Sequence, residues 1–322
     1  MSNTKQQSPD MPPEALHLLH QSGLKALQIA GRTLLPVVQG GMGIGISGNR
    51  LAGSVAAAGG VGTLSSVDLR RHHPDLMDRT RELAPGEEAK AGINAANLEA
   101  IDREIKAARE RTGGKGLLAI NVMRAVSEYA ANVTRALEAG IDAVVVGAGL
   151  PLDLPDLAKD HPKAALIPIL SDARGVQLLV KKWERKKRLP DAIVIEHPRL
   201  AGGHLGAAKI ADLQDTRFDF ENVIPQVRQF FKDAGYEQHI PLIAAGGIRS
   251  HEDIARLQAL GADAVQLGSA FAVTEESDAH AEFKRVLAEA REQQALLGSA
   301  NQAEAVHAGL EKRAPVFSDQ GL

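Results

Sequence analysis

Two related stretches near the C-terminal end specify the architecture: Leu242-Ile243-Ala244-Ala245-Gly246-Gly247-Ile248 and Ala264-Val265-Gln266-Leu267-Gly268-Ser269-Ala270. Each is a short apolar run that ends in small residues. A segment of helical periodicity, Ser250 to Gly261, lies between them, with Ser250 as the expected N-cap. This order of strand, glycine-rich turn, helix and strand is typical of βα units around a parallel sheet.

The same alternation covers most of the chain. Eight short runs rich in Val, Ile, Leu and Ala are predicted to be strands, and each is nearly all apolar, as expected for strands buried on both faces. Periodicity alone also permits a doubly wound sheet, but the strand count and the glycine-rich ends of the last two strands favour an α/β fold of the closed (β/α)8 TIM barrel type. The predicted strands are Pro36–Gln39, Gly60–Leu64, Leu117–Val122, Ala143–Val146, Leu166–Leu170, Ala192–Glu196, Leu242–Ala245 and Ala264–Leu267.

Three further segments have recognisable patterns. A helix that ends at Gly113 is predicted from the apolar face formed by Leu98, Ile101, Ile105 and Ala108. Leu24–Leu35 is expected to form a short hairpin that plugs the bottom of the barrel. The charge run Lys181–Arg188 is interpreted as the solvated face and end of the helix after the fifth strand.

Composition limits the function. The chain has 322 residues and a net charge of −3, without a basic stripe, so nucleic acid is not an expected partner. Apolar runs are strand-sized and the N-terminus is polar, which predicts a cytoplasmic protein without a membrane segment. With no cysteine, the chain has no disulfide, no thiolate metal site and no cysteine nucleophile, and no metal site is predicted. We expect a disordered tail at 1–13, a barrel domain at 14–290 and a helical or irregular tail at 291–322.

The segment Ile195–Gly206 places an imidazole, His204, in a glycine-rich loop that follows a predicted strand. Glycines allow close approach of a ligand, and histidine has the unperturbed pKa nearest to neutrality. We interpret His204 as a proton-transfer group beside a flat or phosphorylated ligand. The alternative is a turn in which His204 caps a helix or fills a gap.

The loops after the last two predicted strands suggest a phosphate site. Gly246, Gly247, Gly268 and Ser269 would present N–H groups to one point, together with a helix N-terminus. In (β/α)8 barrels phosphate is commonly bound at these two loops. The alternative is that tight βα turns simply need glycine.

Polar and small residues follow other strands. Gly40 and Gly41 would let the backbone lie along a flavin ring, with Met42 against one face, but their spacing does not fit a dinucleotide-binding fingerprint. Asn121 can donate and accept hydrogen bonds at a flavin's pyrimidine edge, or can be a turn residue. Glu196 is predicted to contact the ribityl chain or to orient a neighbour; alternatively it pairs with Arg199.

Taken together, these segments resemble the flavin-dependent nitronate monooxygenase family, formerly called 2-nitropropane dioxygenases, and its relative, the flavin-type enoyl-ACP reductase. The matching blocks follow the family's order over roughly Leu34 to Lys284. They are Gln39–Met42, Ala57–Gly62, Ile120–Met123, Ala201–Gly206, Ala244–Ile248 and Gly261–Phe271. Inosine-monophosphate dehydrogenases share the phosphate loops but require a cysteine, which this chain lacks.

The resemblance implies non-covalent FMN at the barrel mouth, with its phosphate on Gly246, Gly247, Gly268 and Ser269. His204 would be the base that removes a proton α to a nitro group. Nitronate would reduce the flavin, and O2 would reoxidise it to yield a carbonyl compound and nitrite. A small-molecule substrate and O2 are therefore the expected partners, and a homodimer is left open. Further cofactor contacts implied are Gly40, Gly41, Met42, Asn121, Glu196, Gly202, Gly203 and Gln266.

Two departures from the family keep other functions open. The tail after about Arg291 does not resemble the relatives' C-terminal segment, which helps to close their site. The loop His197-Pro198-Arg199 is longer and more polar than in many monooxygenases, which could shift the substrate preference towards that of a reductase. An NAD(P)H:quinone reductase, an enoyl reductase and a phosphate-binding barrel without redox chemistry are the competing functions.

Overall fold

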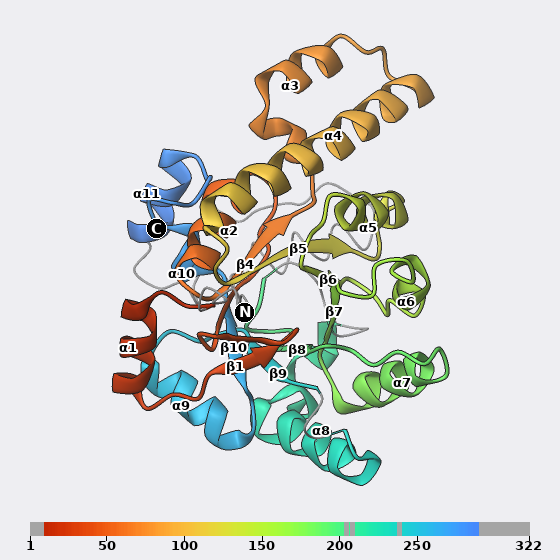
Figure 1. The fold of residues 1–322 in the computed structure, drawn as a ribbon. Coiled ribbons are helices and arrows are strands. Elements are labelled where there is room, and N and C mark those ends of the chain that lie inside the picture. Colours follow the sequence, from red (N-terminus) through yellow and green to blue (C-terminus); the bar gives the residue numbers. More distant parts are fainter. Residues whose placement is uncertain (1–9, 203–205, 207–209, 237–239, 290–322) are drawn as a thin grey trace, which may run out of the picture.

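The chain forms a closed barrel of eight parallel strands surrounded by helices, which confirms the predicted fold (Figure 1). The computed structural model describes residues 10–202, 206, 210–236 and 240–289. Around the barrel the strands are ordered β10-β3-β4-β5-β6-β7-β8-β9. Their bounds are β3 Val37–Gln39, β4 Val61–Ser65, β5 Leu117–Met123, β6 Ala143–Gly147, β7 Ala165–Leu170, β8 Ile193–Glu196, β9 Leu242–Ala245 and β10 Ala264–Leu267.

Helices cover the outside of the barrel, as expected for βα units. Three short 3-10 helices, Leu69–His72, Ile210–Gln214 and Thr216–Phe218, lie in the connections. The α-helices are α1 Pro13–Ser22, α2 Asn49–Ala57, α3 Pro74–Arg81, α4 Glu87–Thr112, α5 Tyr129–Glu138, α6 Leu154–Leu157, α7 Ala173–Glu184, α8 Phe220–Ala234, α9 His251–Leu260, α10 Ser269–Ala272 and α11 Ala281–Glu289. Among the described residues, none of these helices combines the length and the hydropathy needed to span a membrane.

The predicted hairpin is present as β1 (Leu27–Ile29) and β2 (Arg32–Leu34), which pair antiparallel. Leu27, Ile29 and Leu34 are buried in one apolar cluster with inward-facing residues of the barrel strands, such as Leu117 and Ala143. Because Leu117 and Ala143 are the first residues of β5 and β6, this contact is at the amino-terminal end of the strands. The hairpin therefore plugs the bottom of the barrel, as predicted.

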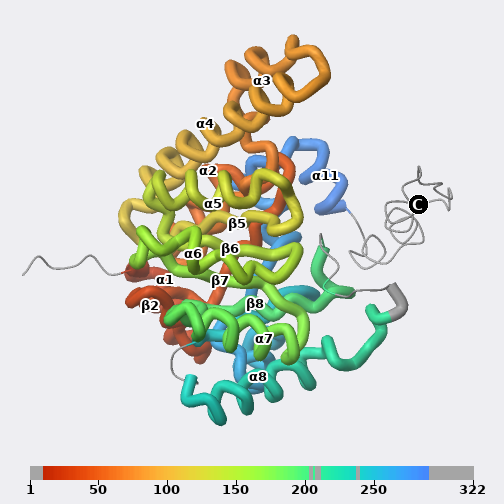
Figure 2. Tube along the Cα trace, turned by 90° about the vertical axis from the view of Figure 1, so that its right-hand side faces the viewer, coloured from red at the N-terminus to blue at the C-terminus, as the bar shows by residue number. Residues whose placement is uncertain are grey.

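The helix predicted to end at Gly113 is α4, and it is longer than its apolar face indicated. Its C-terminal half packs through Ile101 and Ala108, whereas its N-terminal half and α3 extend beyond the barrel (Figures 1 and 2). Leu76 of α3 is buried in the core cluster that includes Ile101. On the surface, Arg103 donates from Nη1 and Nη2 to the carboxylate of Asp75 at 2.9 and 2.8 Å.

Two residues of the segment expected as an N-terminal tail contact the rest of the fold. Asp10 and Met11 were expected in the N-terminal tail, but Met11 is buried against α1, and the Asp10 carboxylate accepts a hydrogen bond of 2.9 Å from the Thr33 N–H. Residues 1–9 and 290–322 lie outside the described part of the chain. In the charge run Lys181–Arg188, α7 ends at Glu184 as expected, but Trp183 is fully buried.

Candidate active site

Alternation along the strands directs three polar side chains into the barrel mouth. Val194 of β8, Ala119 of β5 and Ala264 of β10 belong to the inner apolar cluster. Since successive side chains of a strand point to opposite faces, the residues two positions later face inward as well. These residues are Glu196, Asn121 and Gln266, which are half-buried at the carboxyl ends of their strands.

The segment Gly40-Gly41, which follows β3, runs between two of these side chains. A methyl group added at Gly41 would lie 2.4 Å from Asn121 Cβ, and one added at Gly40 would lie 3.4 Å from Gln266 Nε2. A methyl group added at Gly268 would lie 3.5 Å from Met42 Sδ. The structure thus brings these six predicted residues into one contiguous floor that has side chains at its sides and bare backbone between them.

Buried hydrogen bonds fix the shape of the loop after β3. The Gln39 side chain is fully buried, and its Oε1 accepts a hydrogen bond of 2.8 Å from the Thr63 N–H. Gln39 Nε2 donates to Ser47 Oγ at 2.9 Å, and the same oxygen accepts from the Met42 N–H at 2.9 Å. This role of Gln39 was not predicted from the sequence, although an amide in a buried strand must find hydrogen-bond partners and indicates such a role.

The loops after β9 and β10 are neighbours, because Ala245 and Gln266 are register partners. Gly246 and Gly247 have left-handed φ values of 115° and 70°. Within the described residues, no backbone or side-chain acceptor is found for the N–H groups of Gly246, Gly247, Gly268 and Ser269. These donors are free to bind an anion.

The two helices next to these loops differ in what their N-termini can offer. At α9, Asp253 accepts hydrogen bonds from the N–H groups of Arg249 and Ser250, at 2.9 and 3.1 Å, and completes a capping box with Ser250. The N–H groups of Arg249, Ser250 and Asp253 are therefore bonded within the start of α9 itself. Because a carboxylate already lies there, the start of α9 is less suited to an anion than that of the short α10.

His197, directly after β8, faces outward and anchors the glycine loop. Its ring lies edge-on to Phe220, with the centroids 5.6 Å apart, and its Nε2 is 3.3 Å from Asp219 Oδ1. Its Nδ1 accepts from the Arg199 N–H at 3.3 Å, so the proton belongs on Nε2, and burial lowers the pKa of His197. The loop His197-Pro198-Arg199, which is polar in sequence, is thus packed against the start of α8 through its first residue.

The parts of the glycine loop that flank His204 contact both neighbouring strand ends. A methyl group at Gly246, after β9, would lie 3.1 Å from the Ala201 N, and one at Gly206 would lie 1.8 Å from Ser171 Oγ, after β7. Gly202 is described and exposed. Gly203 and His204 lie outside the described residues.

Glu196 has neither a hydrogen bond nor an ion pair among the described residues. Arg199, its predicted alternative partner, donates instead to Gln214 Oε1 at 2.7 Å. Burial raises the pKa of Glu196 to about 7. A carboxyl group that holds its proton near neutrality and faces a barrel mouth is typical of a functional site.

Replacing Glu196 by glutamine should change how the stability of the protein without cofactor depends on pH. The pKa of Glu196 is about 7 in the folded chain, above its unfolded value, so the parent should lose stability as pH rises from about 4.5 to 7. Glu196→Gln should abolish about 1–3 kcal/mol of this loss. Urea unfolding at pH 5 and pH 8 measures it, with the exposed Glu138→Gln as control. Identical pH dependence in parent and Glu196→Gln would show that this carboxyl is not desolvated.

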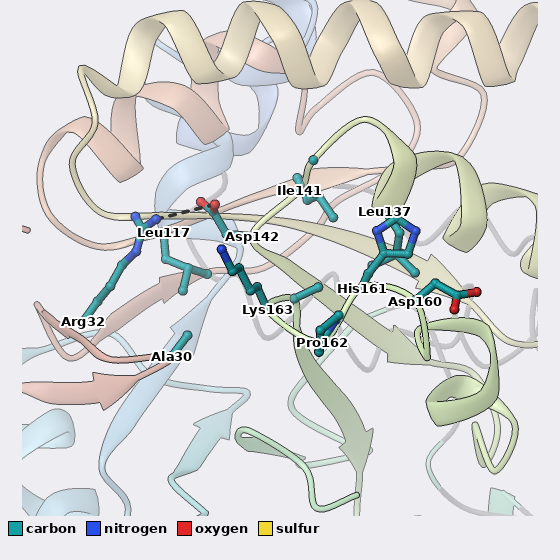
Figure 3. A pocket seen from close by; sticks show the side chains of 12 residues that line it. Ala30, Arg32, Leu117, Leu137, Ile141, Asp142, Asp160, His161, Pro162 and Lys163 are labelled. Carbon is teal, nitrogen blue, oxygen red and sulfur yellow. Dashed lines mark ion pairs between the residues drawn. The ribbon is translucent and has the colours of Figure 1, made fainter.

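Two cavities lie away from the carboxyl ends of the strands. One, of about 580 Å³, is lined by residues that precede β6 and β7, including Asp142 and Lys163, and therefore lies at the amino-terminal end of the barrel (Figure 3). There Arg32 of the hairpin is 3.5 Å from Asp142, an ion pair that ties the plug to the barrel. The other, of about 690 Å³, lies between α4 and α5. Neither is lined by any of the predicted site residues.

A closed parallel (β/α)8 barrel with inward polar side chains at the carboxyl ends of its strands is the architecture of barrel enzymes. The chain belongs to the nitronate monooxygenase family, whose sequence profile matches residues 26–313. It is accordingly an oxidoreductase of a flavin-dependent family.

Curated relatives agree with this assignment. A probable nitronate monooxygenase of Bacillus subtilis (strain 168) is 28% identical over 262 residues, which cover 80% of this chain and 71% of that protein. A probable nitronate monooxygenase of Staphylococcus aureus (strain Newman) is 24% identical over 254 residues, or 76% of this chain and 66% of that protein.

Solved structures show the same fold. FabK from Thermotoga maritima has a TM-score of 0.55 at 21% identity. The superposition covers 84% of this chain and 66% of the FabK chain. The nitroalkane oxidase from Streptomyces ansochromogenes has a TM-score of 0.57 at 21% identity, with coverages of 78% and 69%. At these identities the likeness concerns the barrel and not its substrate.

Proposed function

We propose that the chain is an FMN-dependent nitronate monooxygenase that oxidises alkyl nitronates and nitroalkanes with O2 to carbonyl compounds and nitrite. The observation that carries the proposal is the bare-backbone floor between Asn121 and Gln266, next to four free N–H groups, in a chain of this family. A flat ring with a phosphate at one end matches such a surface in shape and in charge.

The residues at the rim fit FMN in four respects. Gly246, Gly247, Gly268 and Ser269 offer N–H donors for the phosphate. Gly40 and Gly41 leave room for a ring. Asn121 and Gln266 offer amide donors and acceptors for its polar edge, and Met42 offers an apolar contact. When bound, FMN supplies the two-electron acceptor that no side chain of this chain provides.

His204 is the proposed base. The described residues on either side of it support this role, because Ala201 lies against Gly246 after β9 and Gly206 lies against Ser171 after β7, both at carboxyl ends of strands. A neutral nitroalkane must lose the proton on its α-carbon before it is oxidised, and a neutral imidazole can accept that proton. A preformed nitronate has already lost it and does not need the base.

Reduction by NADH distinguishes this function from its rivals. We expect the purified protein to bind FMN with a yellow flavin spectrum that NADH leaves oxidised under argon, whereas the nitronate of 2-nitropropane should bleach it. Admission of air should restore the colour and release nitrite. Bleaching by NADH would identify a quinone or enoyl reductase instead. A protein that takes up no FMN would exclude the flavoenzyme function and leave a barrel without redox chemistry.

A further inference from the structure

The carboxyl end of each barrel strand has positions that face into the barrel. Glu196 is the acidic residue among these described, inward-facing positions. It pairs in register with Ala245 of β9, whose small side chain leaves the space beside it open, and Ala245 pairs in turn with Gln266 of β10. The corresponding described positions on other strands are uncharged; they are Gly40, Ser65, Asn121, Gly147, Ile169 and Gln266.

No charged side chain of the described residues is turned towards Glu196. On its own segment, His197 pairs with Asp219 of the α8 N-cap, and Arg199 pairs with Gln214. After β7, Asp172 Oδ1 accepts from the Gly175 N–H at 2.6 Å as the N-cap of α7.

The other side of β8 offers no partner either. After β9, the first charged residue is Arg249, which is exposed beside Asp253. His204 lies outside the described residues. The environment of Glu196 therefore disfavours its charge by desolvation, with no cation in the described part to compensate.

We propose that Glu196 binds the anionic substrate in its protonated form, donating a hydrogen bond from its carboxyl group to an oxygen of the nitronate. This inference rests on the proposed function. A protonated carboxyl makes a short, charge-assisted hydrogen bond to an oxyanion, whereas an ionised one would repel it at contact distance. Glu196 would thus select for an anion that arrives with its charge already formed.

The direction of the pH effect follows from the titration of Glu196. Burial raises its pKa to about 7, so the protonated fraction declines as pH rises through neutrality. If only the protonated form binds, the affinity for an anion falls about tenfold for each pH unit above that value. This fall in affinity with rising pH is opposite to the effect of a base such as His204, which should make activity on neutral nitroalkanes rise with pH.

Binding of isobutyrate to the FMN-loaded protein tests the inference. Isobutyrate carries a planar carboxylate on the same branched skeleton on which 2-nitropropane nitronate carries its nitro oxygens, and it is not oxidised by this chemistry. Its Kd, measured by perturbation of the flavin spectrum, should rise about fiftyfold between pH 7 and pH 9 in the parent, because half of Glu196 is already ionised at pH 7. Glu196→Gln, the neutral isostere, should bind with nearly constant affinity, and the exposed Glu138→Gln should keep the parent profile.

Calorimetry measures directly the proton that is taken up on binding. Titrations in two buffers of different ionisation enthalpy at pH 8 should show uptake of close to one proton per isobutyrate bound in the parent, and almost none in Glu196→Gln. Absence of proton uptake, absence of isobutyrate binding at any pH, or a parent-like pH profile in Glu196→Gln would overturn the inference. Proton uptake on FMN binding to the apoprotein instead would make Glu196 a cofactor contact and would also overturn it.

Failure of the proposed function has a different signature. A protein without a flavin spectrum, or one that NADH bleaches, is recognised before isobutyrate is added. A yellow protein that passes both tests, and oxidises nitronate without linked proton uptake, would retain the function and lose only the role of Glu196.

Discussion

A Gly268→Val variant should fold and yet bind FMN on the order of a hundredfold more weakly, or worse. A side chain at this position would collide with the phosphate and keep the N–H donors away from it. Two lost charge-assisted hydrogen bonds, at about 1.5–3 kcal/mol each, correspond to this loss of affinity. Titration of the apoprotein with FMN, followed by quenching of flavin fluorescence, gives the Kd.

Of the glycines in the two predicted phosphate loops, Gly268 is the best one to replace. Its φ is −110°, outside the left-handed region, and, among the described residues, apart from its chain neighbours, Met42 Sδ, at 3.5 Å, is the one atom within 4 Å of an added Cβ. Gly247 is a poor choice, because its φ of 70° and a contact of 3.0 Å to Leu200 Cδ1 would strain any variant. Ala270→Val, at an exposed site in the same short helix, is the matched control. A folded Gly268→Val protein with parental FMN affinity would place the phosphate elsewhere.

The strands were predictable because their environment leaves a local trace. A strand covered by helices outside and packed barrel inside is apolar at every position, as in Ala143–Gly147, where all five residues are buried. The helix α9 could be delimited for a similar reason. Ser250 caps it and Gly261 ends it with a φ of 113°, and both signals lie within a few residues of the ends they mark.

Features that depend on distant partners were not predictable. Gln39 looks like the last residue of a strand until Thr63, 24 residues later, becomes its hydrogen-bond partner. His197 looks like part of a polar loop until Asp219, 22 residues later, is brought next to its ring. Likewise, nothing local in Glu87–Thr112 indicates that half of this helix leaves the barrel, because helix propensity does not specify what a helix packs against.

The candidate site falls between these two cases. Strand ends in a barrel converge by topology, so Asn121, Glu196 and Gln266 could be placed at one rim from their sequence positions alone. The environment of each of these side chains could not be predicted from the sequence. Glu196 without Arg199 differs chemically from Glu196 in an ion pair, since the first holds a proton near neutrality and the second does not.

Replacement of His204 by asparagine should separate proton removal from the redox step. The variant keeps some polarity but lacks the base, so oxidation of neutral nitroalkanes should fall by roughly 10²–10⁴-fold. Oxidation of preformed nitronate should suffer much less, because no proton remains to be removed. In the parent, kcat/KM for 2-nitropropane should rise as the imidazole loses its proton, and this limb should be missing in the variant.

The two substrates serve as controls for each other, because both need the same bound FMN and the same access to the barrel mouth. An equal loss on both, with FMN retained, would assign His204 to binding or flavin positioning and would contradict its role as base. A selective loss on the neutral substrate, with the alkaline decline for nitronate unchanged, is expected if His204 and Glu196 act separately. The imidazole then limits the neutral substrate at low pH, and the carboxyl group limits the anion at high pH.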